Sequence, residues 1–412
     1  MAGAKQRGTL ILNISLRTGP LALVAPLLFA TAVLTLPSAQ AQTFTVLHSF
    51  SDKGDGGFPY AGVNLIVGSL YGTTSEGGRY GYGTVYELKH GGSSWVLSTL
   101  YNFTGGRDGG YPLGRVTAGP GGILYGTTAA GGDGYGTVFT LRLPATACHT
   151  AICPWIETVL YRFQGGSDGA YPEYADDLVF DQAGNIYGTT SGDSSGNDGT
   201  VFELSPSNGG WTETILHHFT NAEQPFAGVT FDTAGNLYGT TPNGGAGYGT
   251  VYKLTPSGSG WTYNTIYEFQ SPSYPIGGVT FDPSGNLYGT TISSGSGGYA
   301  FELQSSNGGW TFTNIYNNFA SNFGAFDTPT LDAAGNAYGT VFTEGPSNFG
   351  LVFKLTPSSG GWTETNLTLF GIGNNDGNSP YGSVVLDASG NVYGTTLQGG
   401  SDGNGTVWEI TP

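Results

Sequence analysis

The tripeptide Tyr-Gly-Thr occurs seven times in this chain at intervals of 50 to 62 residues, and this regularity limits the fold more than any other feature. A tandem unit of roughly 50 residues is one supersecondary element that cannot bury its apolar face alone and must stack on its neighbours. The chain is therefore expected to be one architecture repeated seven times. The tyrosines of the copies are Tyr71, Tyr125, Tyr187, Tyr238, Tyr288, Tyr338 and Tyr393.

Each unit contains four short β-prone runs, as the fourth unit shows. The runs cover residues 227–231, 237–241, 249–254 and 261–269, and turns rich in Gly, Pro, Asn, Asp and Ser separate them. Runs of this length with such turns are typical of an antiparallel meander, and helical periodicity is absent after residue 41. We predict an all-β fold, a seven-bladed β-propeller of four-stranded antiparallel blades.

The two ends of the repeat region complement each other. Residues 43–50 align with the fourth run of the other units, whereas the chain ends on a third run, residues 405–410. The last unit thus lacks one strand and the N-terminal region has one to spare. We predict that the N-terminal strand joins the last blade and closes the ring, which removes the edge that an open sheet would present.

An Asp-x-x-Gly-Asn turn follows the first run in five units. It lacks the acidic spacing of a calcium loop, so we predict a structural turn in which Asp accepts backbone hydrogen bonds while Gly and Asn tolerate positive φ. The glycine of Tyr-Gly-Thr is expected to let the backbones of adjacent blades approach closely. The turn aspartates are Asp181, Asp232, Asp282, Asp332 and Asp387.

Residues 1–41 have the pattern of a signal peptide. Lys5, Arg7 and Arg17 precede an apolar stretch from residue 21 to 36, and Ala39-Gln40-Ala41 is a small-residue cleavage site. The stretch is short for a membrane span, which needs about 20 residues, although an uncleaved signal anchor remains an alternative. We predict one exported domain over residues 42–412, monomeric, without a membrane span after cleavage, and either secreted, periplasmic or at the cell surface.

The charge and the cysteine content of the chain limit which macromolecules and which metals it could bind. The formal net charge is −17 and the body of the chain has no basic cluster, which argues against nucleic acid and anionic membrane surfaces. In an exported chain, the Cys-x4-Cys pair Cys148 and Cys153 predicts a local disulfide, with two free thiols as the alternative. No further Cys or His pair completes a zinc set, and we predict neither a metal nor a cofactor.

The repeat units resemble a known family. Segments such as Gly-Asn-Leu-Tyr-Gly-Thr-Thr and Gly-Tyr-Gly-Thr-Val, over residues 43 to 412, resemble the GloVer tandem repeat of bacterial exported proteins. The resemblance implies export and a variable C-terminal anchor, with no enzymatic activity to transfer. This sequence departs from the family pattern because no sorting tail precedes Pro412, which leaves the presence of an anchor open. A looser similarity to kelch propellers, in the glycine pair, Tyr86 and Trp95, concerns the fold alone.

The sequence offers little for catalysis. His48 and His217 occupy a slot that other units fill with Tyr, and no P-loop, Gly-x-Ser-x-Gly or His-Glu-x-x-His motif occurs. A glycosidase or lyase needs only two suitably placed acids, so the carboxylates remain candidates. We therefore favour a non-catalytic protein over an enzyme.

The loops before the first run of each unit carry the candidate site. Asp-Gly turns there are followed by aromatic residues, and such loops are expected to share one face, where rings and acids suit a sugar. The residue before the inner-strand apolar position is small in five units but is Arg115 and Asp177 in two adjacent ones, and Glu173 and Asp176 add acids in the unit of Asp177. The two opposite charges are either a solvated pair on a loop or a pair at the channel mouth that marks the site. The candidate ligand-binding residues are Asp108, Tyr111, Arg115, Asp168, Tyr171 and Asp177.

Three functions follow from these observations. The favoured one is a non-catalytic propeller that binds a polysaccharide or a surface protein across one face. The first alternative is a carbohydrate-active enzyme that uses acids of that face, and the second is a structural protein of the cell envelope.

Overall fold

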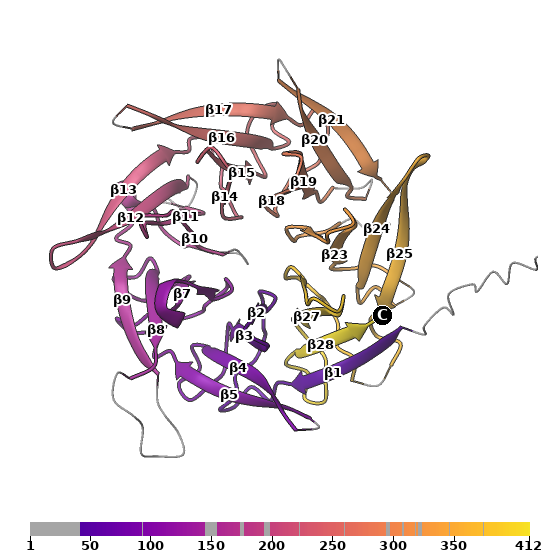
Figure 1. Ribbon diagram of the computed structural model, residues 1–412. Coiled ribbons are helices and arrows are strands. Elements are labelled where there is room, and N and C mark those ends of the chain that lie inside the picture. Colours follow the sequence, from indigo (N-terminus) through magenta and orange to yellow (C-terminus); the bar gives the residue numbers. More distant parts are fainter. Residues whose placement is uncertain are drawn as a thin grey trace, which may run out of the picture. The chain divides into compact units, whose positions relative to one another are not determined.

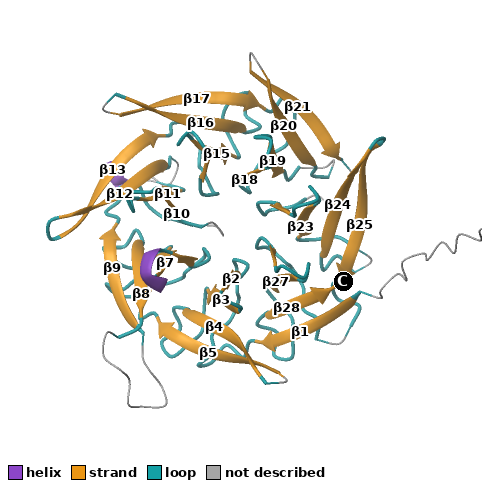
Figure 2. Ribbon diagram, in the orientation of Figure 1, coloured by secondary structure: helices purple, strands orange, loops and turns teal. Residues whose placement is uncertain are grey.

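The computed structural model describes residues 42–412 apart from 93, 145–154, 174–176, 193–197, 222, 259, 294–296, 307–308, 318, 320–323, 346 and 374. Ala41–Pro412 forms one compact unit. Its described residues form seven four-stranded antiparallel sheets arranged as blades around a ring (Figures 1 and 2), which confirms the predicted seven-bladed β-propeller. Between the sheets, the described residues contain two single-turn 3-10 helices, η1 (Pro120–Gly122) and η2 (Gly166–Asp168).

Every blade is a meander whose first and shortest strand lies nearest the centre of the ring (Figure 1). Blades 1 and 2 consist of β2 (Asn64–Ile66), β3 (Ser69–Thr74), β4 (Thr84–Gly91) and β5 (Ser94–Asn102), and of β6 (Thr117–Ala118), β7 (Leu124–Thr128), β8 (Thr137–Arg142) and β9 (Ile156–Arg162). Blades 3 and 4 consist of β10 (Val179–Phe180), β11 (Ile186–Thr190), β12 (Thr200–Ser207) and β13 (Gly210–His218), and of β14 (Thr230–Phe231), β15 (Leu237–Thr241), β16 (Thr250–Ser257) and β17 (Gly260–Glu268). Blades 5 and 6 consist of β18 (Val279–Phe281), β19 (Leu287–Thr290), β20 (Ala300–Ser306) and β21 (Gly309–Tyr316), and of β22 (Thr330–Leu331), β23 (Ala337–Val341), β24 (Leu351–Ser358) and β25 (Gly361–Leu369).

Blade 7 contains both ends of the repeat region. Its strands are β26 (Val385–Leu386), β27 (Val392–Thr396), β28 (Thr406–Thr411) and, as the outermost strand, β1 (Thr43–Ser49). β1 pairs antiparallel with β28, with Thr43 opposite Thr411, and it has a register shift between Val46 and His48. The outer strand pairs of the other blades have a shift at the same place, for example between Val251 and Tyr252. β1 is therefore a genuine fourth strand, and the predicted closure is confirmed.

The glycine of Tyr-Gly-Thr has a different partner from the one we expected. Gly239 lies opposite Tyr252 on the third strand, and a Cβ placed on it would come within 2.4 Å of the Tyr252 hydroxyl. In each blade an aromatic ring of the third strand covers this glycine, so the glycine makes room for a ring of its own blade. The expected close approach of neighbouring backbones is wrong for this position. The seven rings belong to Tyr86, Phe139, Phe202, Tyr252, Phe301, Phe353 and Trp408.

The threonine of the tripeptide links neighbouring blades. Thr240 Oγ1 donates a hydrogen bond at 2.9 Å to the carbonyl oxygen of Gly277, just before the inner strand of the next blade. Thr395 makes the equivalent bond at 2.9 Å to the carbonyl oxygen of Ala61 and so connects blade 7 with blade 1. We call each such contact region between consecutive blades a joint. The other pairs are Thr73 with Gly114, Thr189 with Ala227, Thr290 with Asp327 and Thr340 with Gly382.

A glycine and a proline meet at six of the joints. A Cβ added to Gly249, which has φ +99°, would lie 2.4 Å from Cδ of Pro275 in the next blade. This contact explains why Gly-Thr-Val in one unit is followed by a proline in the next. The pairs are Gly83 with Pro112, Gly136 with Pro172, Gly199 with Pro225, Gly249 with Pro275, Gly350 with Pro380 and Gly405 with Pro59.

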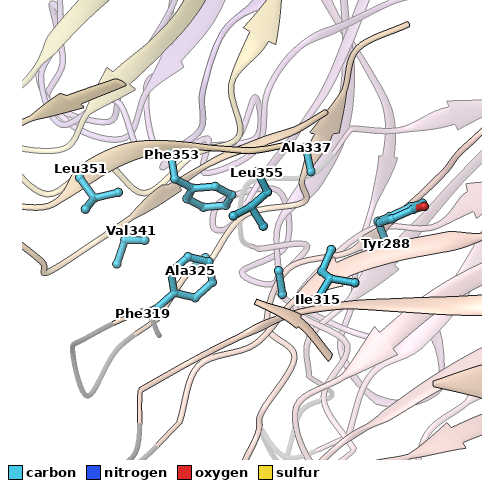
Figure 3. Packing of buried hydrophobic residues seen from close by; sticks show 10 residues of the cluster. Tyr288, Ile315, Phe319, Ala325, Ala337, Val341, Leu351, Phe353 and Leu355 are labelled. Carbon is cyan, nitrogen blue, oxygen red and sulfur yellow. The ribbon is translucent and has the colours of Figure 1, made fainter. Parts of the chain in front are cut away.

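The hydrophobic core is divided among the joints. Figure 3 shows the cluster between blades 5 and 6, in which Tyr288 and Ile315 of blade 5 lie near Phe353 and Leu355 of blade 6. Equivalent clusters occupy the other joints, so each blade buries its faces against two neighbours, as a stacked repeat requires. At the joint of blades 3 and 4 the ring of His217 stacks on Tyr263 at 4.0 Å, and burial lowers the pKa of His217 to about 4.

Candidate functional site

The meander gives the ring two unlike faces. In every blade the first-to-second and third-to-fourth strand turns emerge on one side, because consecutive strands are antiparallel. The second-to-third strand loops and the connections between blades emerge on the other. We call these sides the turn face and the loop face.

A hollow of about 590 Å³ lies on the loop face, in front of blades 7, 1, 2 and 3. Aromatic and apolar side chains from the inter-blade connections form much of its wall, together with loop residues after the second strands. We call it the loop-face hollow. Its lining residues are Phe58, Tyr60, Ser75, Glu76, Tyr111, Leu113, Ala129, Ala130, Tyr171, Glu173, Leu397 and Gln398.

Three aromatic residues of the hollow have a backbone conformation that large side chains rarely adopt. Phe58, Tyr111 and Tyr171 have φ values of 55°, 54° and 56°. Such residues cost conformational energy and persist only where surrounding contacts hold them. Here the contacts are backbone hydrogen bonds: the N–H of Tyr111 donates to the carbonyl of Tyr82 at 2.9 Å, and its carbonyl accepts from Ala129 at 3.0 Å.

A second aromatic ring braces each of the two tyrosines. Tyr82 meets Tyr111 edge to face with ring centroids 5.6 Å apart, and Tyr135 meets Tyr171 in the same way at 5.9 Å. Both supporting residues come from the preceding blade, so each ring is fixed across a joint. Tyr111 remains 37% exposed, which leaves ring surface available to a ligand.

The hollow also contains two carboxyl groups, Glu76 and Glu173. Burial raises the pKa of Glu173, which accepts a hydrogen bond from Ser191 Oγ at 3.4 Å. In the other six blades the equivalent position carries an aliphatic or aromatic residue, so Glu173 is the exception at the channel mouth. Asp176, the other acid noted in this blade, lies outside the described residues. The six equivalents are Tyr60, Leu113, Phe226, Ile276, Phe326 and Tyr381.

Asp108 and Asp168 line none of the described hollows but brace the loops in which they occur. Asp108 Oδ2 accepts hydrogen bonds from the N–H of Thr104 at 2.9 Å and from the Tyr101 hydroxyl at 3.1 Å. Asp168 Oδ2 accepts from the N–H of Gln164 at 2.9 Å and from the Tyr161 hydroxyl at 3.1 Å. These contacts are those of turn residues.

Arg115 and Asp177 pair in the central channel. Nε and Nη2 of Arg115 donate to the two carboxylate oxygens of Asp177 at 3.0 and 2.9 Å, and the two side chains are 12% and 27% exposed. Asn64 Nδ2 donates to Asp177 Oδ1 at 3.1 Å and to the carbonyl of Val116 at 3.0 Å. The cluster thus links blades 1, 2 and 3. Two of its members, Arg115 and Asp177, line a small cavity of about 160 Å³.

The structure therefore separates the six predicted site residues into three groups. Tyr111 and Tyr171 share the loop-face hollow, Arg115 and Asp177 share the channel cavity, and the two Asp-Gly aspartates support loops. Sequence reasoning missed Glu76 and Gln398, which follow second strands and have no distinguishing motif. Phe58 was not among the predicted residues either, although it aligns with Tyr111 in the repeat and follows an Asp-Gly turn in the same way.

Three further points from the sequence concern the disulfide, metal binding and a membrane span. Cys148 and Cys153 lie outside them, so the disulfide stays a prediction. Within the described part, no group of three or more His, Cys, Asp or Glu side chains is placed to hold a metal ion. No helix in that part is both long and apolar enough to span a membrane.

Comparisons with known proteins support the fold and identify the family. Solved structures that match include a suggested 6-phosphogluconolactonase from Bacteroides uniformis, 14% identical with a TM-score of 0.51, over 79% of this chain and 88% of that one. A second suggested 6-phosphogluconolactonase, from Bacteroides fragilis, is 13% identical with a TM-score of 0.48, over 81% and 87% of the two chains. At 14% identity the likeness to the Bacteroides uniformis structure concerns the fold alone. No curated protein matches the chain.

The family comparison covers the whole repeat region. A family model described as the Gloeobacter/Verrucomicrobia repeat matches residues 32–246, 152–298 and 232–412. These matches overlap and include all seven blades, in agreement with the resemblance drawn from the repeated motifs. The chain belongs to the Gloeobacter/Verrucomicrobia repeat family.

Proposed function

We propose that this propeller is an exported binding protein and that a glycan binds in the loop-face hollow without being changed chemically. The observation that carries the proposal is the convergence of Phe58, Tyr111 and Tyr171, from three connections, on one hollow of about 590 Å³. That volume falls in the range of small-molecule sites, and such sites combine apolar walls with a few polar groups. Flat rings beside carboxyl and amide groups suit the apolar face and the hydroxyl groups of a sugar.

Charge favours uncharged or amino-bearing sugars. Glu76 and Glu173 are in the hollow, the described residues of its lining include no Lys or Arg, and the chain has a formal net charge of −17. An anionic polysaccharide would meet like charge both at long range and in the site.

The experiment is a glycan array followed by calorimetric titration of the best ligand. Tyr111→Ala and Tyr171→Ala are each expected to weaken binding by about 1–3 kcal/mol, if stacking on a sugar matches base–aromatic stacking in strength. Tyr274→Ala is the matched control, because Tyr274 has positive φ at the equivalent place in blade 5 and does not line the hollow. Affinity that responds equally to all three changes, or to none, would place the site elsewhere.

The enzyme alternative rests on one specific feature. Glu173, whose pKa burial raises, shares the hollow with Glu76, and a glycosidase needs an acid of raised pKa together with a second carboxylate. Release of reducing ends from every bound glycan should be measured in parallel. Product that disappears in Glu173→Gln while binding persists would favour hydrolysis, and binding without product would favour recognition.

A further inference from the structure

The turn face carries two adjoining grooves that the loop-face hollow does not include. One, of about 600 Å³, lies between blades 3 and 4, and the other, of about 670 Å³, lies between blades 4 and 5. They share the segment from Phe231 to Ala234 and so adjoin there, and we call them together the turn-face groove pair. Trp310 and Ser306 extend its outer end in blade 5.

Aromatic residues make this sector unlike the rest of the ring. Phe180, Phe231 and Phe281 occupy the same register position, at the end of the inner strand, and each ring is half-buried. Each meets the tyrosine of the preceding blade edge to face, with centroid distances of 4.9, 5.1 and 5.0 Å. The other blades have smaller residues there, namely Leu65, Ala118, Leu331 and Leu386.

The polar groups of the turns are already occupied. Asp232 accepts hydrogen bonds from the N–H groups of Ala234 and Asn236, both at 2.9 Å, and from the Tyr238 hydroxyl at 3.0 Å. An extended peptide is recognised through unpaired backbone groups of a strand edge, which these saturated turns do not offer. Recognition is left to ring surfaces and to hydroxyl groups such as that of Thr233.

The repeat and the charge define the occupant further. The grooves present the same inner-strand ring at intervals of one repeat unit, which suits a ligand that itself repeats. The lining contains three carboxyl groups, Asp181, Asp232 and Asp282, against one cation, Lys253. Burial would raise the pKa of Asp232, but hydrogen bonds from Asn236 and its neighbours hold it below its usual value. Acidic side chains therefore outnumber the basic one in the described lining. An anionic chain is disfavoured, whereas an uncharged chain of hydroxylated rings is not.

We propose that the turn-face groove pair is a second binding site, and that it takes a linear, uncharged polysaccharide along blades 3, 4 and 5. The site lies at the ends of the inner strands, and the loop-face hollow lies at their beginnings, so the two open on opposite faces. One molecule then holds two polysaccharide segments at once, which makes the ring a cross-linker. The groove pair itself does not depend on the loop-face proposal, although cross-linking does.

The test uses changes that the repeat itself supplies. Phe→Leu at each of the three positions installs the residue that blades 1, 6 and 7 have in the same register, so the fold is expected to persist. Binding of soluble xylan and mixed-linkage β-glucan is measured by titration, with alginate as the anionic control. The background is Tyr111→Ser/Tyr171→Ser, which removes the loop-face rings; Ser379 has φ 59° at the equivalent place, so serine is tolerated there.

Residual binding in that background is expected for at least one neutral chain and not for alginate. Phe231→Leu, at the residue both grooves share, should weaken it about 5-fold or more, and Phe180→Leu or Phe281→Leu by less. Leu331→Val, in the same register of blade 6, should leave it unchanged. Absence of residual binding, or indifference to all three Phe→Leu changes, overturns the second site. Loss of affinity from the two tyrosine changes alone, in an otherwise wild-type chain, reports separately on the loop-face hollow.

Discussion

At the joints every blade presents nearly the same groups, whereas around the loop-face hollow equivalent positions differ from blade to blade. The joint contact of Thr240 with Gly277 recurs as far as Thr395 with Ala61, where the ring closes. In contrast, the position before the joint proline that holds Tyr111 in blade 2 holds Gln224 in blade 4 and Ser379 in blade 7, and φ is positive at Tyr111 and Ser379. The comparison teaches that uniform positions carry the stability of a repeat protein, and that its sites form where neighbouring blades stop being equivalent.

The largest effect should come from removing β1, the strand that completes blade 7 and closes the ring. Deleting residues 42–50 from a chain that begins at residue 42 removes β1, and with it Phe50, which is completely buried. We expect a loss of several kcal/mol, because the apolar area of a whole strand is exposed at roughly 25 cal/mol per Å². Chemical denaturation measures it, with the chain that begins at residue 42 as the reference. Unchanged unfolding would contradict the closure argument.

Adding a single methyl group at a joint should lower the free energy of unfolding by less than the deletion does, but by a measurable amount. In Gly249→Ala the new Cβ would lie 2.4 Å from Pro275 Cδ and 2.7 Å from the carbonyl oxygen of Thr241, at φ +99°. We expect a loss of about 2–4 kcal/mol from overpacking and backbone strain together. Gly247→Ala is the control, because Gly247 has φ +93° and nothing within 4 Å of the added Cβ. Equal losses for the two variants would show that strain alone is responsible.

The Arg115–Asp177 pair tests whether a departure from the repeat can itself be structural. Asp177→Ala leaves the largely buried Arg115 guanidinium without its carboxylate, and breaking such a pair costs more than removing both partners. A double-mutant cycle of Arg115→Ala and Asp177→Ala should give a coupling energy of about 1–3 kcal/mol in unfolding experiments. A coupling near zero in stability, together with weaker ligand binding, would assign the pair to the site and not to the ring.

The smallest expected effect is a pH dependence at a joint. The Tyr161 hydroxyl lies 2.9 Å from Oε2 of Glu213 in blade 3 and 3.1 Å from Oδ2 of Asp168. The Tyr161 hydroxyl has a single proton, so it can donate a hydrogen bond to only one of the two carboxyl groups at a time. Burial raises the pKa of Glu213 from 4.5 to about 7, and the nearby charge of Asp168 adds to the effect.

A raised carboxyl pKa gives stability that is complete below pH 4.5 and is lost as the pH rises through 7. Solvent contact reduces the effect, so we expect a loss on the order of 1 kcal/mol between pH 5 and pH 8. Glu213→Gln should flatten that part of the stability profile, since an amide imitates the protonated acid. A profile that keeps its slope in this variant would assign the titration to another group, for example Glu157, whose pKa burial also raises to about 7.

Much of the ring could be predicted from the sequence, because the motifs that specify the blades recur at regular intervals along it. Seven copies of one tripeptide predicted seven blades, and the unmatched runs at the two ends predicted that β1 would pair with β28. The partner of the tripeptide glycine could not be predicted in this way. The ring that covers Gly239 belongs to Tyr252, which lies opposite it only after the strands have paired, so its role depends on cross-strand register.

The candidate site was harder to predict from the sequence, because the same motif occurs in structural turns and in binding sites. An Asp-Gly pair before an aromatic residue fits both a turn and an acid beside a ring, and only the contacts of Asp108 with Thr104 and Tyr101 distinguish them. Tyr111 and Tyr171 were recognisable because the repeat aligns them. Glu76 was not, since its approach to the hollow depends on the curvature of the ring.

Closure by β1 also determines when the ring can be completed. Thr411 and Thr43 are 368 residues apart in sequence, yet they meet in one sheet. During synthesis β1 is among the first of the described strands to be made and β28 is the last, so the outer edge of blade 7 has no partner until both exist. Contacts of such sequence separation form late and slowly. The chain therefore spends its assembly as an open arc with two unpaired ends, and this interval is when it is most exposed to aggregation and most dependent on protection.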